Sequence, residues 1–166
     1  MFSETEQKAI QEKLEQLQKV KEGTLSHKEL ADLITERRIN WIGENLNEML
    51  AKYSGLNPEE QAYRIVFFEH MVINPNHSRM VRVSPRKIRI ESYNFCPYLE
   101  ACQQLDLDTR YVCREIGEPS IQRMIEAINP NLRFSRNYAN IRPHNRVFCE
   151  ECIELLITES RVLTIF

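Results

Sequence analysis

The sequence has almost no net charge, few glycines and no cysteine before residue 96. Its 22 Lys and Arg side chains are nearly balanced by 24 Asp and Glu, which gives a formal net charge of -2. A chain so close to neutral lacks the bulk positive charge of proteins that bind DNA, RNA or anionic membranes. With only 4 glycines and 7 prolines, and with 42% apolar residues, the composition excludes a disordered chain and is typical of a globular domain.

Long apolar runs are also missing from the sequence. None approaches the about 20 residues that a membrane-spanning helix needs, and the N-terminal MFSETEQKAIQEK lacks the basic start and apolar stretch of a secretory signal. We therefore expect a cytoplasmic protein without a membrane partner. The length suits a single domain, 1–166, which buries enough surface to fold without disulfides.

The first half of the chain has helical periodicity. Apolar residues recur at helical spacing over 4–21 and 27–53, and again beyond Pro58. In the first of these segments the apolar stripe is thin, because it consists of Ile10, Leu14 and Leu17. A thin stripe predicts that this helix lies on a partner surface or pairs with a second copy of the chain in a homodimer.

The period changes from helical to two after Pro75. Alternating residues predict strands at 80–83 and 87–91, and two more strands follow at 132–138 and 147–157. Helices are expected at 97–105 and 109–127, the second interrupted by Gly117 and Pro119. The expected fold is α+β, in which N-terminal helices precede a mixed, largely antiparallel sheet with packed helices. Its expected parts are a helical arm at 1–22, a helical part at 23–73 and a cysteine-bearing α+β core at 79–166.

One basic cluster lies on the first two predicted strands, where it would form a single solvated face. It consists of Arg79, Arg82, Arg86, Lys87 and Arg89. The near-neutral total charge and the absence of a recognised nucleic-acid module predict that this face does not bind nucleic acid.

The five cysteines all follow residue 95, and their odd number argues against a disulfide framework. Thiolates are soft ligands, and Zn²⁺ takes about four nitrogen or sulfur donors. Cys149 and Cys152 form the one C-x2-C pair. On a regular strand their side chains point to opposite faces, so they share a metal ion only if the backbone turns or bulges there.

Cys96 is the best candidate for a reactive thiolate. If Pro97 opens a helix, Cys96 lies at the N-cap, where the helix dipole and free N–H groups lower the pKa of a thiol. Cys102 is expected in the core, and Cys113 suits either role. His144, near Cys149, is a ligand or proton shuttle in one interpretation and an exposed loop residue in the other. The residues alone leave a metal site, a reactive thiol and purely structural cysteines open.

Several short motifs in the second half resemble a known family. YNFCPYLE at 93–100, LDL at 105–107, VC at 112–113, AINPNLRF at 127–134 and VFC at 147–149 are similar to the L-2-amino-thiazoline-4-carboxylic acid hydrolase-like family. The resemblance covers roughly residues 88–157 and matches Cys96, Cys113 and Cys149. A more distant similarity is to 4-vinyl reductase-type domains, which use cysteines near a zinc ion or sense small molecules.

The resemblance implies a hydrolase-like protein that cleaves C–N bonds in a small heterocycle or amide with a carboxylate. Its cysteines would line one pocket and hold Zn²⁺ or another thiolate-bound metal, or one thiolate would act as nucleophile. Glu118 is the candidate for proton transfer, and Arg133, one of two arginines that bracket Phe134, for binding the carboxylate. The alternative is a non-catalytic sensor or regulatory module that binds a metal or small ligand through the same cysteines. The candidate site residues are Cys96 and Glu118 for catalysis, Arg133 and Tyr98 for substrate binding, and Cys96, Cys113, Cys149 and Cys152 for the metal.

Overall fold

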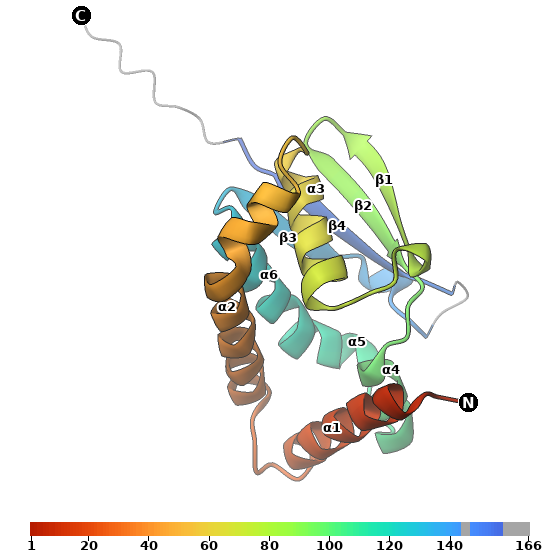
Figure 1. The fold of residues 1–166 in the computed structure, drawn as a ribbon. Coiled ribbons are helices and arrows are strands. Elements are labelled where there is room, and N and C mark those ends of the chain that lie inside the picture. The colour runs from red at the N-terminus through yellow and green to blue at the C-terminus, as the bar shows by residue number, and fades with distance from the viewer. Residues whose placement is uncertain (144–146, 158–166) are drawn as a thin grey trace, which may run out of the picture.

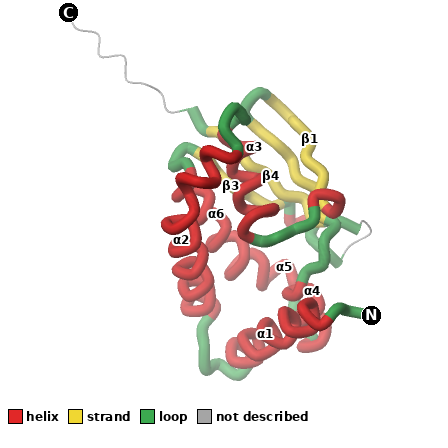
Figure 2. Tube along the Cα trace, in the orientation of Figure 1, coloured by secondary structure: helices red, strands yellow, loops and turns green. Residues whose placement is uncertain are grey.

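The computed structural model describes residues 1–143 and 147–157 of the chain. Helices make up its N-terminal half, and a four-stranded antiparallel sheet follows with further helices (Figures 1 and 2). The expected α+β class is therefore confirmed. Among the described residues, none of the helices combines the length and the apolar character that crossing a bilayer requires.

Two long helices begin the chain, close to the ranges expected from the sequence. Helix α1 spans Glu4–Lys21 and helix α2 spans His27–Lys52. Each has a complete capping box, with Ser3 and Glu6 at the first and Ser26 and Glu29 at the second. The turn between the helices places Gly23 at a φ of 78°, in the left-handed region that favours glycine.

The third helical segment changes its winding along its length. It starts as helix α3, Pro58–Tyr63, and continues as the π-helix η1, Arg64–His70. Met71 and Ile73 donate backbone hydrogen bonds to Val66 and Phe67 at 2.9 Å and so close the helix, and Val72 adopts a φ of 54°. A short 3₁₀ turn, η2, Pro75–His77, then leads into the sheet.

The sheet contains β1 (Ser78–Ser84), β2 (Lys87–Ser92), β3 (Leu132–Arg136) and β4 (Cys149–Leu155) in the order β1-β2-β4-β3. All three strand pairs are antiparallel, so the sheet is not mixed. Ile88 pairs with Ile153, which pairs with Phe134, and this row lies on the buried face. Two residues further along the same face, Glu151 pairs with Ile90 and Arg136, and another two residues on, Ser92 pairs with Cys149. The inner face is thus apolar at one end and polar at the other.

Four helical segments connect β2 to β3. They are α4 (Pro97–Leu105), α5 (Thr109–Val112), the π-helix η3 (Cys113–Gly117) and α6 (Glu118–Ile128). The expected interruption at Gly117 and Pro119 is a change of winding rather than a break in the helical chain. Pro119 lies in the first turn of α6, and the wider π turn before it keeps the chain helical. A last 3₁₀ turn, η4, spans Tyr138–Asn140.

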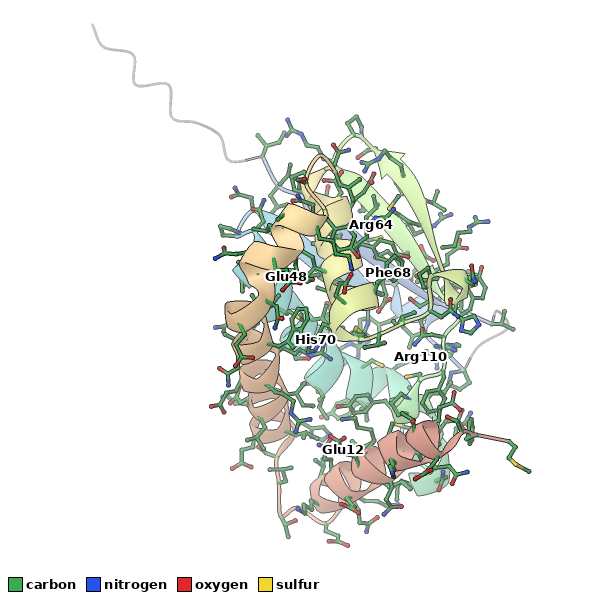
Figure 3. The ribbon with its side chains drawn as sticks, viewed as in Figure 1. Glu12, Glu48, Arg64, Phe68, His70 and Arg110 are labelled. Atoms are coloured by element: carbon green, nitrogen blue, oxygen red, sulfur yellow. The ribbon has the colours of Figure 1, made fainter. Side chains whose placement is uncertain are left out.

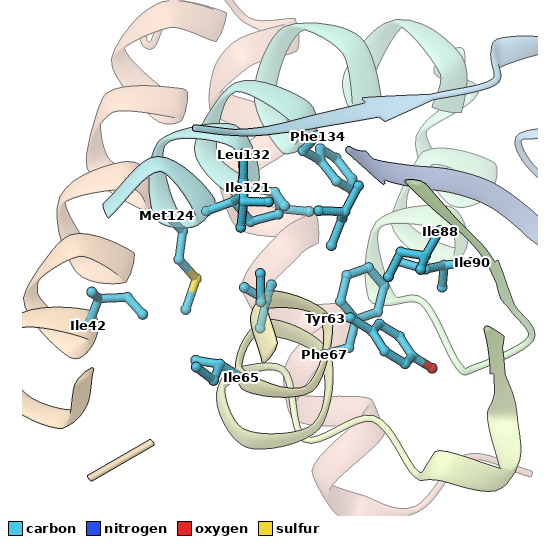
Figure 4. Close-up of a cluster of buried hydrophobic side chains, with 14 of the residues drawn as sticks. Ile42, Tyr63, Ile65, Phe67, Ile88, Ile90, Ile121, Met124, Leu132 and Phe134 are labelled. Atoms are coloured by element: carbon cyan, nitrogen blue, oxygen red, sulfur yellow. The ribbon is translucent and has the colours of Figure 1, made fainter. Parts of the chain in front are cut away.

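The main core lies between the inner face of the sheet and helices α2, η1 and α6 (Figure 4). Ile65, Phe67, Ile88 and Met124 are among its fully buried members. The packing of these elements fixes the position of the polar end of the sheet.

A second core corrects the expectation for the N-terminal helix. Leu17 of α1 is fully buried in a cluster with residues of α2, α4, α5 and η3, and Ile10 is also buried. Helix α1 packs along α4 of its own chain (Figure 1). Since the apolar stripe is covered within the chain, it gives no support for a homodimer through this helix.

The expected single basic face on β1 and β2 was also wrong. Arg82 pairs with Ile88 on the inner face, whereas Arg89 pairs with Val81 and lies on the outer face. Arg82 forms ion pairs with Glu59 at 2.6 Å and with Glu60. On the outer face Glu91 contacts Arg79 at 3.1 Å and Arg89 at 3.4 Å. The cluster is therefore divided between two faces, and these three arginines are paired with carboxylates.

Candidate functional site

A cavity of about 730 Å³ lies where α1, α2, η1, α4, η3 and β3 meet. Its walls come from segments far apart in the sequence, and Figure 3 shows Glu12 on α1 and His70 on η1 approaching this region from two sides. Both π-helices have one end in the cavity wall, because His70 is the last residue of η1 and Cys113 is the first residue of η3. π turns re-aim side chains and are frequent at functional sites.

Arg38 carries a positive charge into this cavity. It lies one helical turn after Ile34 and one before Ile42, on the apolar side of α2. Its Nε and Nη1 atoms are buried and have no hydrogen-bond partner among residues 1–143 and 147–157. Burial is the main cause that lowers the pKa of Arg38 to about 10, and the positive charges of Arg136 and Arg37 lower it further. Two of the three guanidinium nitrogens are thus buried, and no carboxylate of the described residues pairs with them.

Tyr98 and His70 add two more unpaired polar atoms to the same walls. The Tyr98 hydroxyl is buried without a hydrogen-bond partner in the described part of the chain, and burial raises its pKa well above the usual value. His70 packs edge-on against Trp41, and its buried Nδ1 is also unpaired there. Burial, with Arg38 as a second cause, lowers the pKa of His70 to about 4, so the ring is neutral at pH 7. Buried polar atoms are nearly always hydrogen-bonded, and a group of unpaired ones marks a place for a ligand or water.

Arg136 is a second buried guanidinium in the cavity wall, and this one is paired. Its Nε donates to Glu151 Oε1 at 2.9 Å, and Ser92 donates to the other carboxylate oxygen at 2.9 Å. Its Nη1 lies 3.4 Å from the carbonyl oxygen of Cys113. Burial by itself lowers the pKa of Arg136, but the Glu151 carboxylate and Cys113 outweigh it and raise the pKa. The Arg136 charge is therefore balanced before any ligand enters.

Two of the predicted cysteines line the cavity. Cys96 occupies the N-cap of α4 as the sequence indicated, and Cys113 faces the same space. Burial nevertheless raises the pKa of Cys96 and raises that of Cys113 to about 12. The backbone N–H of Leu99 in the first turn of α4 does lower the Cys96 pKa as expected, but burial outweighs it, and both thiols are protonated at neutral pH.

Cys149 lies close to these two thiols but outside the cavity wall. Its proximity raises the pKa of Cys96 and of Cys113, which places the three cysteines of the resemblance in one region. The Cys149 sulfur accepts hydrogen bonds from the backbone N–H of Arg142 at 3.4 Å and from its Nε at 3.3 Å. Arg142 also donates to the carbonyl oxygen of Asn94 at 2.9 Å, so it ties Cys149 to the segment that precedes α4.

The predicted four-thiolate metal site is not formed. Strand β4 pairs regularly, so Cys152 lies beside Arg89 and Ser135 on the outer face while Cys149 faces inward. Cys102 is fully buried in the second core, as expected. Within the described ranges, no three His, Cys, Asp or Glu side chains are grouped to hold a metal ion. All five cysteines are free.

Two further candidates lie away from the cavity. Glu118 begins α6 and accepts a hydrogen bond from the Tyr138 hydroxyl. Arg133 is exposed on the outer face of β3, opposite Glu154. His144, the loop candidate, lies outside the described residues. Tyr98, Cys96 and Cys113 are therefore the predicted site residues that the cavity brings together.

Comparisons with known proteins do not identify the chain. No family model matches it, and neither a curated protein nor a solved structure does so. The resemblance of residues 88–157 to the thiazoline hydrolase-like family stays a prediction. The function is consequently argued from the cavity.

Proposed function

We propose that the protein binds a small carboxylate-bearing molecule in this cavity, with Arg38 and Tyr98 holding the carboxylate. The observation that carries the proposal is the unpaired guanidinium of Arg38 in the cavity wall. A buried charge without a partner costs several kcal/mol, so a fold retains one most readily where a ligand completes it.

The chemistry of both side chains suits a carboxylate. A guanidinium presents parallel N–H donors that match two carboxylate oxygens, and such charge-assisted hydrogen bonds are stronger than neutral ones. The Tyr98 hydroxyl keeps its proton because its pKa is raised, and it therefore also donates. A bound anion would offset the desolvation that lowers the pKa of Arg38.

The rest of the wall suits a small organic molecule more than a bare ion. Ile34, Ile73, Val112 and Ile121 contribute apolar surface, and the volume of about 730 Å³ falls within the range of small-molecule sites. The neutral His70 offers one more hydrogen-bonding atom to such a ligand.

Hydrolysis of a C–N bond in the bound molecule is the second candidate function. It is favoured by the presence of the Cys96 and Cys113 thiols and the neutral His70 ring on the same cavity. Because the thiols are protonated at neutral pH, a nucleophilic attack requires a base, and the unpaired Nδ1 of His70 in the same cavity wall is the candidate. In this case a thiol adds to the amide carbon while its proton passes to His70. The C–N bond then breaks as His70 returns that proton to the leaving amine, and water hydrolyses the thioester to a carboxylic acid and the free thiol.

Calorimetric titration with a panel of small carboxylates tests the binding proposal. We expect the wild type to bind at least one of them and Arg38→Met to lose affinity about tenfold or more. Arg133→Met is the matched control, because Arg133 is exposed on the opposite face of the sheet, and it should bind as the wild type does. Equal binding by wild type and Arg38→Met would sink the proposal. Mass spectrometry of the same mixtures separates the two functions, because hydrolysis yields a product and simple binding yields none.

A further inference from the structure

We infer that the ligand is a small dicarboxylate, with its second carboxylate held by Lys13 and Arg37 at the α1 side of the cavity. The inference rests on the proposed function, since it assigns the first carboxylate to Arg38 and Tyr98. It extends that function from a carboxylate-bearing molecule to a narrower ligand class.

Lys13 and Arg37 share a single carboxylate oxygen. Glu12 Oε1 lies 3.1 Å from Lys13 Nζ and 3.2 Å from Arg37 Nη1, and Gln16 Nε2 also donates to it at 3.2 Å. The three charged residues all belong to the cavity wall. Two cations and one anion leave one positive charge in excess at this position, in addition to that of Arg38.

Tyr98 joins the two positive positions. Lys13 Nζ lies 5.1 Å from the centre of the Tyr98 ring, and the Lys13 side chain is only 15% exposed. The Tyr98 hydroxyl is near enough to Arg38 for the guanidinium to influence its ionisation. Burial lowers the pKa of Lys13, Glu12 raises it in part, and the positive charges of Arg37 and Arg38 lower it, so Lys13 is close enough to both arginines to be affected by their charges.

Once Arg136 is set against Glu151, the cations Lys13, Arg37 and Arg38 face the carboxylates Glu6 and Glu12, so the wall keeps an excess of positive charge. Among the described residues Arg136 is balanced by Glu151, so Glu12 is the one carboxylate paired with Lys13 and Arg37. Glu6, the other acid of the wall, accepts the N–H of Ser3 in the α1 cap. Two anionic groups joined by a short apolar spacer fit two cationic positions in a wall that also has apolar residues, whereas a single phosphate contacts one position at a time.

Paired titrations test this inference with ligands that differ by one carboxylate. Succinate is compared with butyrate, and glutarate with pentanoate, on the full chain. We expect the better dicarboxylate to bind at least tenfold tighter than its monocarboxylate partner. In Arg37→Met this preference should fall to less than about threefold, while the affinity for the monocarboxylate stays the same. Arg37 is 69% exposed, so its replacement leaves the fold intact.

Lys8→Met and Lys13→Met form a second matched pair on α1. Lys8 is exposed and pairs with Glu4, so its replacement should leave the dicarboxylate preference unchanged, whereas Lys13→Met should reduce it. Equal binding of both members of each ligand pair, or an unchanged preference in Arg37→Met, would overturn the dicarboxylate assignment and leave the proposed function standing. Tighter binding of butyl phosphate than of succinate would overturn it as well. Binding of no carboxylate at all would instead remove the proposed function.

Discussion

Gly117 lies directly against the guanidinium group of Arg136. A Cβ atom at position 117 would be 2.7 Å from Arg136 Nη1, closer than real Cβ atoms approach another heavy atom. The guanidinium cannot easily retreat, because Glu151 and the carbonyl oxygen of Cys113 hold it on its other sides. The glycine in η3 is therefore the residue that lets the buried ion pair reach the cavity wall.

Gly117→Ala should destabilise the protein by about 1–3 kcal/mol, because either the ion pair or the π turn has to shift. Chemical denaturation measures the effect. Gly43→Ala is the control. Gly43 lies within α2, and a Cβ atom there would have no atom of the described residues within 4 Å apart from its own turn of helix. The same change there should stabilise the protein by up to about 1 kcal/mol through helix propensity. Similar effects in both variants would contradict the close approach to Arg136.

The boundaries of helices and strands were predictable from the sequence where local residues determine them. The helices expected at 4–21 and 27–53 agree with α1 and α2 to within one residue, and alternation marks the strands. The π turns at η1 and η3 were not predicted. A π turn adds one residue to a single helical turn, which produces no repeating apolar pattern in the sequence. Tertiary packing decides where that extra residue is placed.

The site was predictable only in part. The cysteine cluster pointed to Cys96 and Cys113, but the pKa argument for Cys96 considered the helix end and not the burial that outweighs it. Arg136 shares its strand face with Phe134, and Arg133 does not, so strand alternation alone would have selected Arg136. Arg38 could have been noticed as a charged residue within the apolar stripe of α2. Its role in a cavity, however, depends on the packing of α4 nearby, which no local pattern predicts.

Arg38→Met should raise the stability of the ligand-free protein while it weakens ligand binding. The replacement removes a buried cation without a partner and keeps an apolar side chain of similar length, so we expect a gain of about 1 kcal/mol or more. Thermal and chemical denaturation of the ligand-free protein measure it. Arg133→Met, on the exposed outer face, should change stability by less than about 0.5 kcal/mol. A loss of stability in Arg38→Met would mean that the guanidinium already has a partner that the fold supplies.

His70 should make the stability depend on pH in the acidic range. Its pKa is lowered to about 4 by burial and then by Arg38, against a usual value of 6.5, so between these two values the unfolded chain binds more protons than the folded one. The contribution is fully present above about pH 6.5 and is lost as the pH falls towards 4. The free energy of unfolding, measured from pH 7.5 to 4, should fall less steeply in His70→Phe, which keeps a ring against Trp41. Parallel curves for the two proteins would show that His70 is not held neutral by the fold.

The thiols of the cavity should react slowly in the native protein. With a pKa of about 12, only about one Cys113 side chain in ten thousand is a thiolate at pH 8, and the thiolate is the form that iodoacetamide attacks. We expect Cys113 to be alkylated at least a hundredfold more slowly in the folded protein than in urea, with the modified positions identified by peptide mass spectrometry. Cys113→Ser serves as the control that assigns the slow phase. A dicarboxylate that fills the cavity should slow this reaction further, because it covers the sulfur as well as the cations. Rapid alkylation of Cys113 in the native state would instead indicate a thiolate there, and would favour the hydrolytic function over simple binding.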